Sequence, residues 1–273
     1  TSVVYLSIMA VSFSPKPYLK SIFQDKHSNY WTIHGSGGIG FSPHPKGITR
    51  FDSKMNSPFH LTNNNISTIC EDQSGNLWLG NSFNGIDVFN WVKGKTVSYF
   101  YEPNNPNSLG KGATQFIYRD SRQEMWIASY WGGLQKYRPQ SDDFTSYVHD
   151  PDDVNTISSN DIRHISEDAE GNLWLTSHGR GIDKFDIAKG VFKNYNFENN
   201  ALSNNYTYNS IVDKNGNLWV STSWGLSVLS PNEQLFETYY FDESDSNSLS
   251  SNTVNSVYED GLGQIWAATN KGL

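Results

Sequence analysis

Cysteine, long apolar runs and basic clusters are what this 273-residue sequence lacks. Its one cysteine, Cys70, excludes an internal disulfide framework and any site built from several cysteine ligands. The longest apolar run spans residues 3–11, whereas crossing a bilayer takes about 20 residues, so we expect no membrane contact by this chain. Net charge is −8 without a dense Lys/Arg cluster, which argues against nucleic acid as a partner.

Aromatic residues, in contrast, are abundant and regularly placed. Six tryptophans follow one another at distances of 47, 48, 48, 45 and 47 residues, and an aspartate stands six residues before each. A fixed period of this length indicates a repeat protein. The repeats are centred on Trp31, Trp78, Trp126, Trp174, Trp219 and Trp266, and the aspartates are Asp25, Asp72, Asp120, Asp168, Asp213 and Asp260.

Each repeat reads as a short antiparallel sheet. The Asp-x-x-Gly segment before Leu-Trp predicts a hairpin turn, because the Asp side chain caps backbone amides and Gly supplies a positive φ. A Gly-aliphatic run such as Gly181-Ile182 predicts a third strand, and a Phe-x-x-Tyr pattern such as Phe192/Tyr195 a fourth. An acidic return loop then leads to the next repeat. Since each aspartate and tryptophan recurs in every repeat, we interpret both as structural, with Trp packing between sheets and Asp capping the turn.

Four strands in 45–48 residues, with no helical periodicity, predict an all-β fold: a β-propeller of six four-stranded repeats in a single domain, residues 1–273. The last repeat ends at Leu273 without its two outer strands. Residues 1–20 are expected to supply them and close a six-bladed ring; the alternative is a fragment of a seven-bladed propeller. In the first repeat, residues 47–51 are predicted as the third strand, with a long loop after His34.

The Asp-x-x-Gly-Asn-Leu-Trp unit and the Asn-Ser-Leu-Ser-Ser-Asn return loop at 247–252 resemble the two-component regulator propeller repeat. That family, best known from Bacteroidetes, builds the periplasmic sensor region of hybrid two-component systems. The resemblance implies an extracytoplasmic ligand-sensing propeller on the periplasmic side of the inner membrane, with an oligosaccharide as ligand. It further implies a homodimer through the full-length protein. The kinase domain is absent from this chain, so no enzyme activity and no cofactor are expected.

Ligand-binding residues are expected where the repeats differ, in the loops between second and third strands. Aromatic, imidazole and cationic side chains there suit a sugar, since rings stack on pyranose faces and polar groups bind hydroxyls. The candidates are His34, Phe83, Tyr130, Trp131, His178, Arg180, Trp224 and Lys271. Two alternatives stay open: a propeller lyase or hydrolase using scattered histidines such as His34, His44, His164 and His178, or a protein-interaction scaffold. No catalytic motif and no metal-ligand spacing occurs in the sequence.

Overall fold

The computed structural model describes residues 19–43, 49–53, 60–83, 85–90, 93–199, 201–231 and 235–273. The chain divides into two compact units, one formed by residues 1–127 and 135–146, the other by residues 128–134 and 147–273. Strands are the only long regular elements in the described part of the chain, which therefore holds no helix long and apolar enough to span a membrane. The expected all-β fold is confirmed.

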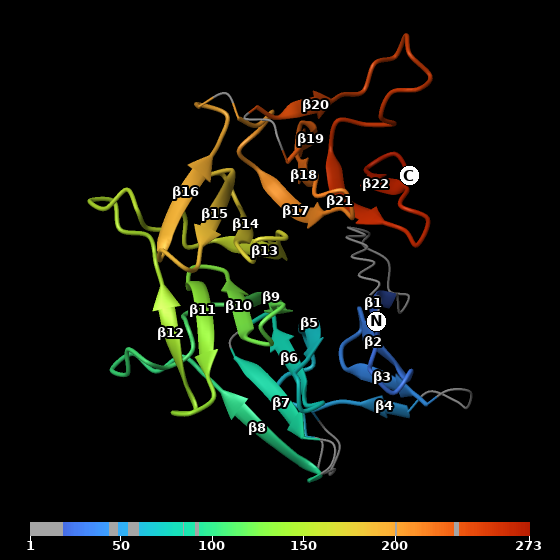
Figure 1. Ribbon diagram of the computed structural model, residues 1–273. Coiled ribbons are helices and arrows are strands. Elements are labelled where there is room, and N and C mark those ends of the chain that lie inside the picture. The colour runs from blue at the N-terminus through green and yellow to red at the C-terminus, as the bar shows by residue number, and fades with distance from the viewer. Residues whose placement is uncertain are drawn as a thin grey trace. The chain divides into compact units, whose positions relative to one another are not determined.

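Three sheets fall wholly or mainly in the first unit, and their strands follow one another in chain order (Figure 1). The first sheet has β1 (Leu19–Gln24), β2 (Tyr30–His34), β3 (Ile39–Ser42) and β4 (Thr49–Phe51). The second has β5 (Ile66–Glu71), β6 (Leu77–Asn81), β7 (Ile86–Asn90) and β8 (Lys95–Tyr99). The third has β9 (Thr114–Arg119), β10 (Met125–Ser129), β11 (Gly133–Arg138) and β12 (Asp143–Tyr147).

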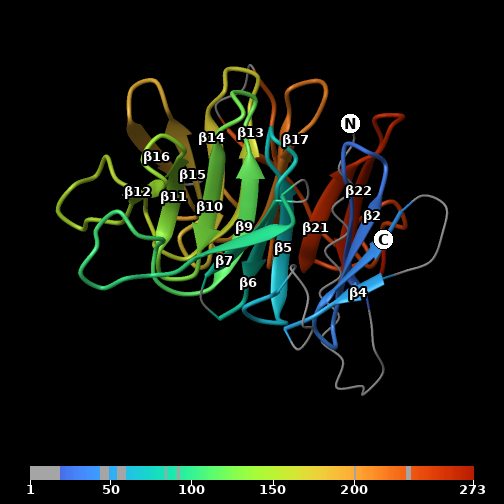
Figure 2. The ribbon, with the colours of Figure 1, turned by 90° about the horizontal axis from the view of Figure 1, so that it is seen from below.

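The second unit holds the remaining sheets. The fourth sheet has β13 (Ile162–Glu167), β14 (Leu173–Ser177), β15 (Ile182–Asp186) and β16 (Val191–Tyr195). The fifth has β17 (Thr207–Val212), β18 (Leu218–Thr222), β19 (Gly225–Leu229) and β20 (Glu237–Tyr239), and the sixth has β21 (Val254–Glu259) and β22 (Ile265–Thr269). In this unit the first strands of successive sheets are neighbours, so β17 lies between β13 and β21 (Figure 2). Successive antiparallel sheets packed in this way are the blades of a propeller.

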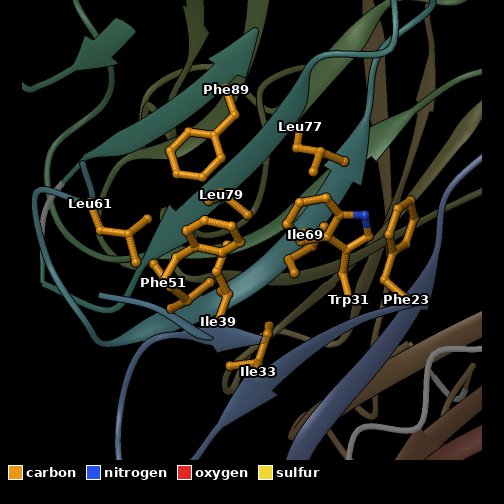
Figure 3. Packing of buried hydrophobic residues seen from close by; sticks show 11 residues of the cluster. Phe23, Trp31, Ile33, Ile39, Phe51, Leu61, Ile69, Leu77, Leu79 and Phe89 are labelled. Atoms are coloured by element: carbon orange, nitrogen blue, oxygen red, sulfur yellow. The ribbon is translucent and has the colours of Figure 1, made fainter. Parts of the chain in front are cut away.

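Burial explains why the second strand of each blade is so apolar. All five residues of β6, β10 and β14 are buried, whereas the outer strand β16 alternates between exposed and buried positions. Side chains on successive blades then meet. In the first unit, Phe23 and Trp31 lie in one cluster with Ile69 and Leu77 of the next sheet (Figure 3). Burial of such large side chains contributes about 2 kcal/mol each and holds neighbouring blades together.

Two details of the sequence-based fold were wrong. Six four-stranded sheets were expected, but five have four strands and the sixth has two among the described residues, because only four residues follow β22. Residues 1–18, most of the segment expected to complete it, lie outside the described residues. In the first blade, the third strand is β3 rather than residues 47–51. Gly37 and Gly38, both with positive φ, turn the chain directly after His34, and residues 49–51 form the fourth strand.

Candidate functional site

The six aspartate–tryptophan pairs lie at the turns between first and second strands. In every pair the indole Nε1 donates to the aspartate Oδ2, over 2.9 to 3.2 Å. The other carboxylate oxygen accepts the backbone N–H four residues on, as in Asn217 N to Asp213 at 2.8 Å. The sequence indicated the turn cap but not the direct bond to tryptophan. One carboxylate thus closes the turn and fixes the orientation of the indole in the second strand.

These bonds also set the acidity of the aspartates. Burial alone would raise the pKa of Asp25 and of Asp213, but the donors from the tryptophan and the following residues outweigh it, and both pKa values are lowered. The pKa of Asp168 is lowered in the same way, with Lys184 Nζ at 2.9 Å from its Oδ2 as an added cation. The carboxylates of Asp25, Asp168 and Asp213 are therefore held as anions.

An asparagine before each of four first strands ties together the two loops of the opposite face. Its backbone carbonyl oxygen accepts the N–H of the glycine in the turn between the second and third strands of the preceding blade. Its Oδ1 accepts a backbone N–H at the start of the return loop. The asparagines are Asn64, Asn160, Asn205 and Asn252; the glycines are Gly38, Gly133, Gly181 and Gly225; the return-loop donors are Ser53, His149, Phe197 and Phe241.

These asparagine ties explain why the loops of this face can carry varied side chains. The two bonds that form each tie come from backbone N–H groups, so these bonds do not constrain the side chains of the donor residues. Asn205 in addition donates from Nδ2 to the Glu198 carboxylate, at 2.8 and 2.9 Å. Adding a Cβ at Gly181 would bring it 2.2 Å from the Tyr195 carbonyl oxygen, and the φ there is +79°, so this glycine is required where it stands. The constant asparagines and glycines thus fix the backbone of these loops, and the side chains of the variable positions project from it.

Large aromatic side chains project into solvent from these loops in the second unit. Trp131 is 63% exposed, Trp224 is 57% exposed and Tyr206 is 46% exposed. Trp131 also holds a φ of +73°, a conformation that costs an L-residue about 1–2 kcal/mol, and its ring packs on Tyr130 with centroids 4.5 Å apart. Exposed rings in a strained turn are not explained by packing of the fold, which makes this face the candidate site.

A polar cluster lies beside these rings. The Asp161 Oδ2 atom is 3.7 Å from Arg163 Nη2 and 3.7 Å from His178 Nδ1, while its Oδ1 is buried without a hydrogen-bond partner among the described residues. The His178 ring packs edge-on against Tyr206, with centroids 4.7 Å apart. Burial raises the pKa of Asp161, although Arg163 and His178 act against it. Backbone bridges hold the cluster: Tyr130 pairs with Asp161, and His178 with Tyr206.

Six of the eight predicted ligand residues therefore belong to the second unit. Tyr130, Trp131 and His178 border the polar cluster, and Trp224 is in the next turn. Hydrogen bonds from the Asn205 amide chiefly lower the pKa of the Glu198 carboxyl, and the charge of Arg180 adds a smaller effect across the same loops. Lys271 Nζ lies 5.2 Å from the Phe241 ring centroid. His34 and Phe83 belong to the first unit, where His34 Nε2 is 2.9 Å from Thr32 Oγ1 and Phe83 is 65% exposed.

Three site residues were missed from the sequence: Asp161, Arg163 and Tyr206. Position in the repeat is the sequence signal that could have identified two of them. Asp161 and Tyr206 each stand between the constant asparagine and the first strand, where the repeats vary. Of the histidines considered for catalysis, His164 is buried in β13 and burial lowers its pKa to about 3, and His44 lies outside the described residues. Among the residues described, no three His, Cys, Asp or Glu side chains are grouped to hold a metal.

Comparison with known families matches the two component regulator propeller at residues 60–83, 156–179, 201–224 and 248–271. Each matched segment runs from a return loop, through the constant asparagine and the Asp–Trp turn, to the turn after the second strand. These four segments are copies of the two component regulator propeller repeat. Outside the family signature, the search of curated proteins gives no match.

Solved structures similar to this chain include extracellular domains from B. thetaiotaomicron. The extracellular domain of the hybrid two component system BT3049 is 29% identical over 78% of this chain and 28% of its own, with a TM-score of 0.67. That of the one component system BT4673 is 21% identical over 99% of this chain and 36% of its own, with a TM-score of 0.73. The chain thus spans 28% and 36% of those two domains.

The same fold also occurs in an enzyme. Virginiamycin B lyase from Staphylococcus aureus is 17% identical over 96% of this chain and 80% of its own, with a TM-score of 0.68. At that identity the likeness concerns the propeller fold alone. The repeat match and the B. thetaiotaomicron domains, in contrast, are both connected by name with two component systems.

Proposed function

We propose that this chain is a periplasmic ligand-sensing propeller of a hybrid two-component signalling protein and that its ligand is an oligosaccharide. The regulator propeller repeats and the likeness to extracellular domains of two component systems support the sensor role. Because the chain spans only part of those domains, the signal would pass through other segments of the whole protein. There a homodimer would relay it, since signalling across a membrane requires subunits to move relative to each other.

One observation carries the ligand class: exposed aromatic rings stand next to a polar cluster on one face of the second unit. Trp131 and Tyr206 flank the groups of Asp161 and His178, with Trp224 in the following turn. An oligosaccharide needs this combination, because the C–H faces of pyranose rings pack on flat apolar surfaces while the hydroxyls require fixed donors and acceptors. A purely structural role for these rings leaves their exposure unexplained.

The first experiment is a thermal-shift screen of the chain against glycan oligosaccharides, each checked afterwards for cleavage. A ligand at 100 times its Kd adds about 2.7 kcal/mol to the free energy of unfolding, a readily measured effect. A shift with the sugar intact supports the sensor. A consumed sugar would overturn it in favour of the lyase or hydrolase alternative, and no shift with any glycan would remove the proposed ligand class.

The same assay tests the face. Trp131→Ala should weaken the binding of whichever oligosaccharide gives a shift by at least tenfold, without lowering the unfolding midpoint of the free protein. The matched control is Leu262→Ala, which removes an 80% exposed side chain from the Asp260 turn at the other end of the strands. Equal affinity of the two variants for the oligosaccharide would show that it binds away from the face that carries Trp131.

A further inference from the structure

We infer that Asp161, between Arg163 and His178, is a subsite for a vicinal diol of an uncharged sugar ring. This inference rests on the proposed function and adds the chemical class of the ligand. It depends on three properties of the cluster: the spacing of its polar atoms, the hydrogen bonds that its carboxylate lacks, and the charge of the loops around it.

The spacing suits two hydroxyl groups. Asp161 Oδ2 is 3.7 Å from both Arg163 Nη2 and His178 Nδ1, which is too long for a direct hydrogen bond. An oxygen atom placed about 2.8 Å from both ends of either gap forms a triangle with them, and can donate to the carboxylate while it accepts from a nitrogen. Two such gaps share one carboxylate oxygen. Two hydroxyls on adjacent carbons can occupy them together.

The carboxylate also lacks the bonds that stabilise the other aspartates. The Asp213 carboxylate accepts four hydrogen bonds, while among the described residues Asp161 Oδ1 is buried without a partner and Oδ2 has long contacts to Arg163 and His178. The Nε of Arg163 is likewise buried without a partner among the described residues. Leaving buried polar groups unsatisfied costs about 1–3 kcal/mol each. A ligand that supplies donors to this carboxylate recovers part of that free-energy cost. If Asp161 had only a structural role, the cost would remain.

Access to the cluster is open on the side of His178. The His178 side chain is 45% exposed, against 12% for Asp161 and 21% for Arg163. A sugar ring entering there would meet Tyr206, whose ring lies 4.7 Å from that of His178. The hydroxyl-binding groups and the stacking ring thus come from two neighbouring blades.

Charge excludes acidic sugars. The Arg163 guanidinium is already opposed by the Asp161 carboxylate, 3.7 Å away. A uronate or sulfate entering the subsite would meet that carboxylate well within the screening length of about 8 Å. The two return loops of the same unit that begin at His149 and Phe241 add no cation; they carry six carboxylates: Asp150, Asp152, Asp153, Asp242, Glu243 and Asp245.

The test compares neutral and acidic oligosaccharides of equal length by calorimetry. The neutral probes are tetrasaccharides of β-1,4-glucan, β-1,4-xylan, β-1,4-mannan and β-1,4-galactan, and the acidic probe is tetragalacturonate. The variant is Asp161→Asn, which keeps the volume and removes the charge. The matched control is Asp152→Asn, the same change at an exposed carboxylate that accepts no hydrogen bond from a described residue. Arg163→Gln is a second variant, for use should Asp161→Asn not fold.

We expect a neutral tetrasaccharide to bind at least tenfold more tightly than tetragalacturonate. Asp161→Asn, or Arg163→Gln, should weaken that neutral binding at least tenfold, and Asp152→Asn should change it less than twofold. Tighter binding of tetragalacturonate would overturn the inferred charge class, and unchanged neutral affinity in both cluster variants would overturn the subsite, each leaving the proposed function in place. Binding of no tetrasaccharide at all would remove the subsite together with the proposed function.

Discussion

Replacing one turn aspartate, Asp213→Asn, should destabilise the second unit strongly. The carboxylate accepts four hydrogen bonds: Oδ1 from the amides of Asn215 at 2.9 Å and Asn217 at 2.8 Å, and Oδ2 from Asn217 Nδ2 at 2.8 Å and Trp219 Nε1 at 2.9 Å. In the variant, one oxygen becomes an NH₂ group that faces two donors. Whichever way the amide is turned, two bonds are lost.

The magnitude follows from the bonds lost. A hydrogen bond to a charged group contributes about 1.5–3 kcal/mol, so two contribute about 3–6 kcal/mol. Local relaxation recovers part of this free energy, and water recovers little because the residue is only 7% exposed. We therefore expect a loss of about 2–4 kcal/mol. Against a typical total of about 5–15 kcal/mol, that is a large fraction of the stability.

Urea denaturation followed by tryptophan fluorescence measures this loss. The matched control is Asp260→Asn in the same unit, where the aspartate accepts three of the four corresponding bonds, from Trp266, Gln264 and Leu262. Trp266 is 45% exposed, so water can replace the lost bonds and the effect should be clearly smaller. A loss for Asp213→Asn below about 1 kcal/mol, or no larger than that of the control, would refute the reasoning.

Three further predictions concern the turns. The difference in stability between the wild type and Asp213→Asn should shrink as pH falls below the ordinary aspartate value of 3.8, because a lowered folded pKa contributes stability above the unfolded pKa that is lost on protonation; urea titrations at pH 7, 4 and 3 measure it. Gln123→Gly should stabilise by about 0.5 kcal/mol, since Gln123 holds a φ of +68° where four of the other five turns have glycine; the urea midpoint should rise, and a fall would contradict the turn assignment. Asn252→Ala should speed hydrogen exchange of the Phe241 amide, which loses its side-chain acceptor, more than that of the Gly225 amide, which keeps the backbone oxygen; unchanged protection of Phe241 would show that the side chain does not hold the return loop.

The repeat, the strand order and the propeller fold could be predicted from the sequence because they depend on residues that recur. The six-residue spacing from Asp to Trp, for example Asp168 to Trp174, is a local property of one hairpin. Where the pattern is irregular, local reasoning failed. In the first blade, Gly38-Ile39 and Gly47-Ile48 both fit the start of a third strand, and the choice was decided by the turn at Gly37 rather than by the pattern.

The candidate site could be predicted only in part. Exposed residues of single turns, such as Trp131 and His178, were found because each stands in a loop that differs between repeats. Asp161 and Arg163 were not, because they stand in or next to a first strand, and their role depends on the strand pairing that brings His178 to them and on Tyr206, which the next blade places against His178. The repeat pattern contains no information about these contacts, because they involve positions at which the repeats differ.

The asparagine ties have a consequence for how such a chain can change. Asn160, Asn205 and Asn252 connect their two loops through main-chain N–H groups, and apart from the Glu198 carboxylate, which Asn205 Nδ2 also binds, these ties do not depend on the side chains of the connected loops. Mutations at the exposed positions can accumulate without disturbing strand pairing or the packing of the tryptophans. Specificity and stability are then inherited through separate sets of positions, and a duplicated copy of this gene could acquire a different chemical signal while its architecture stays the same.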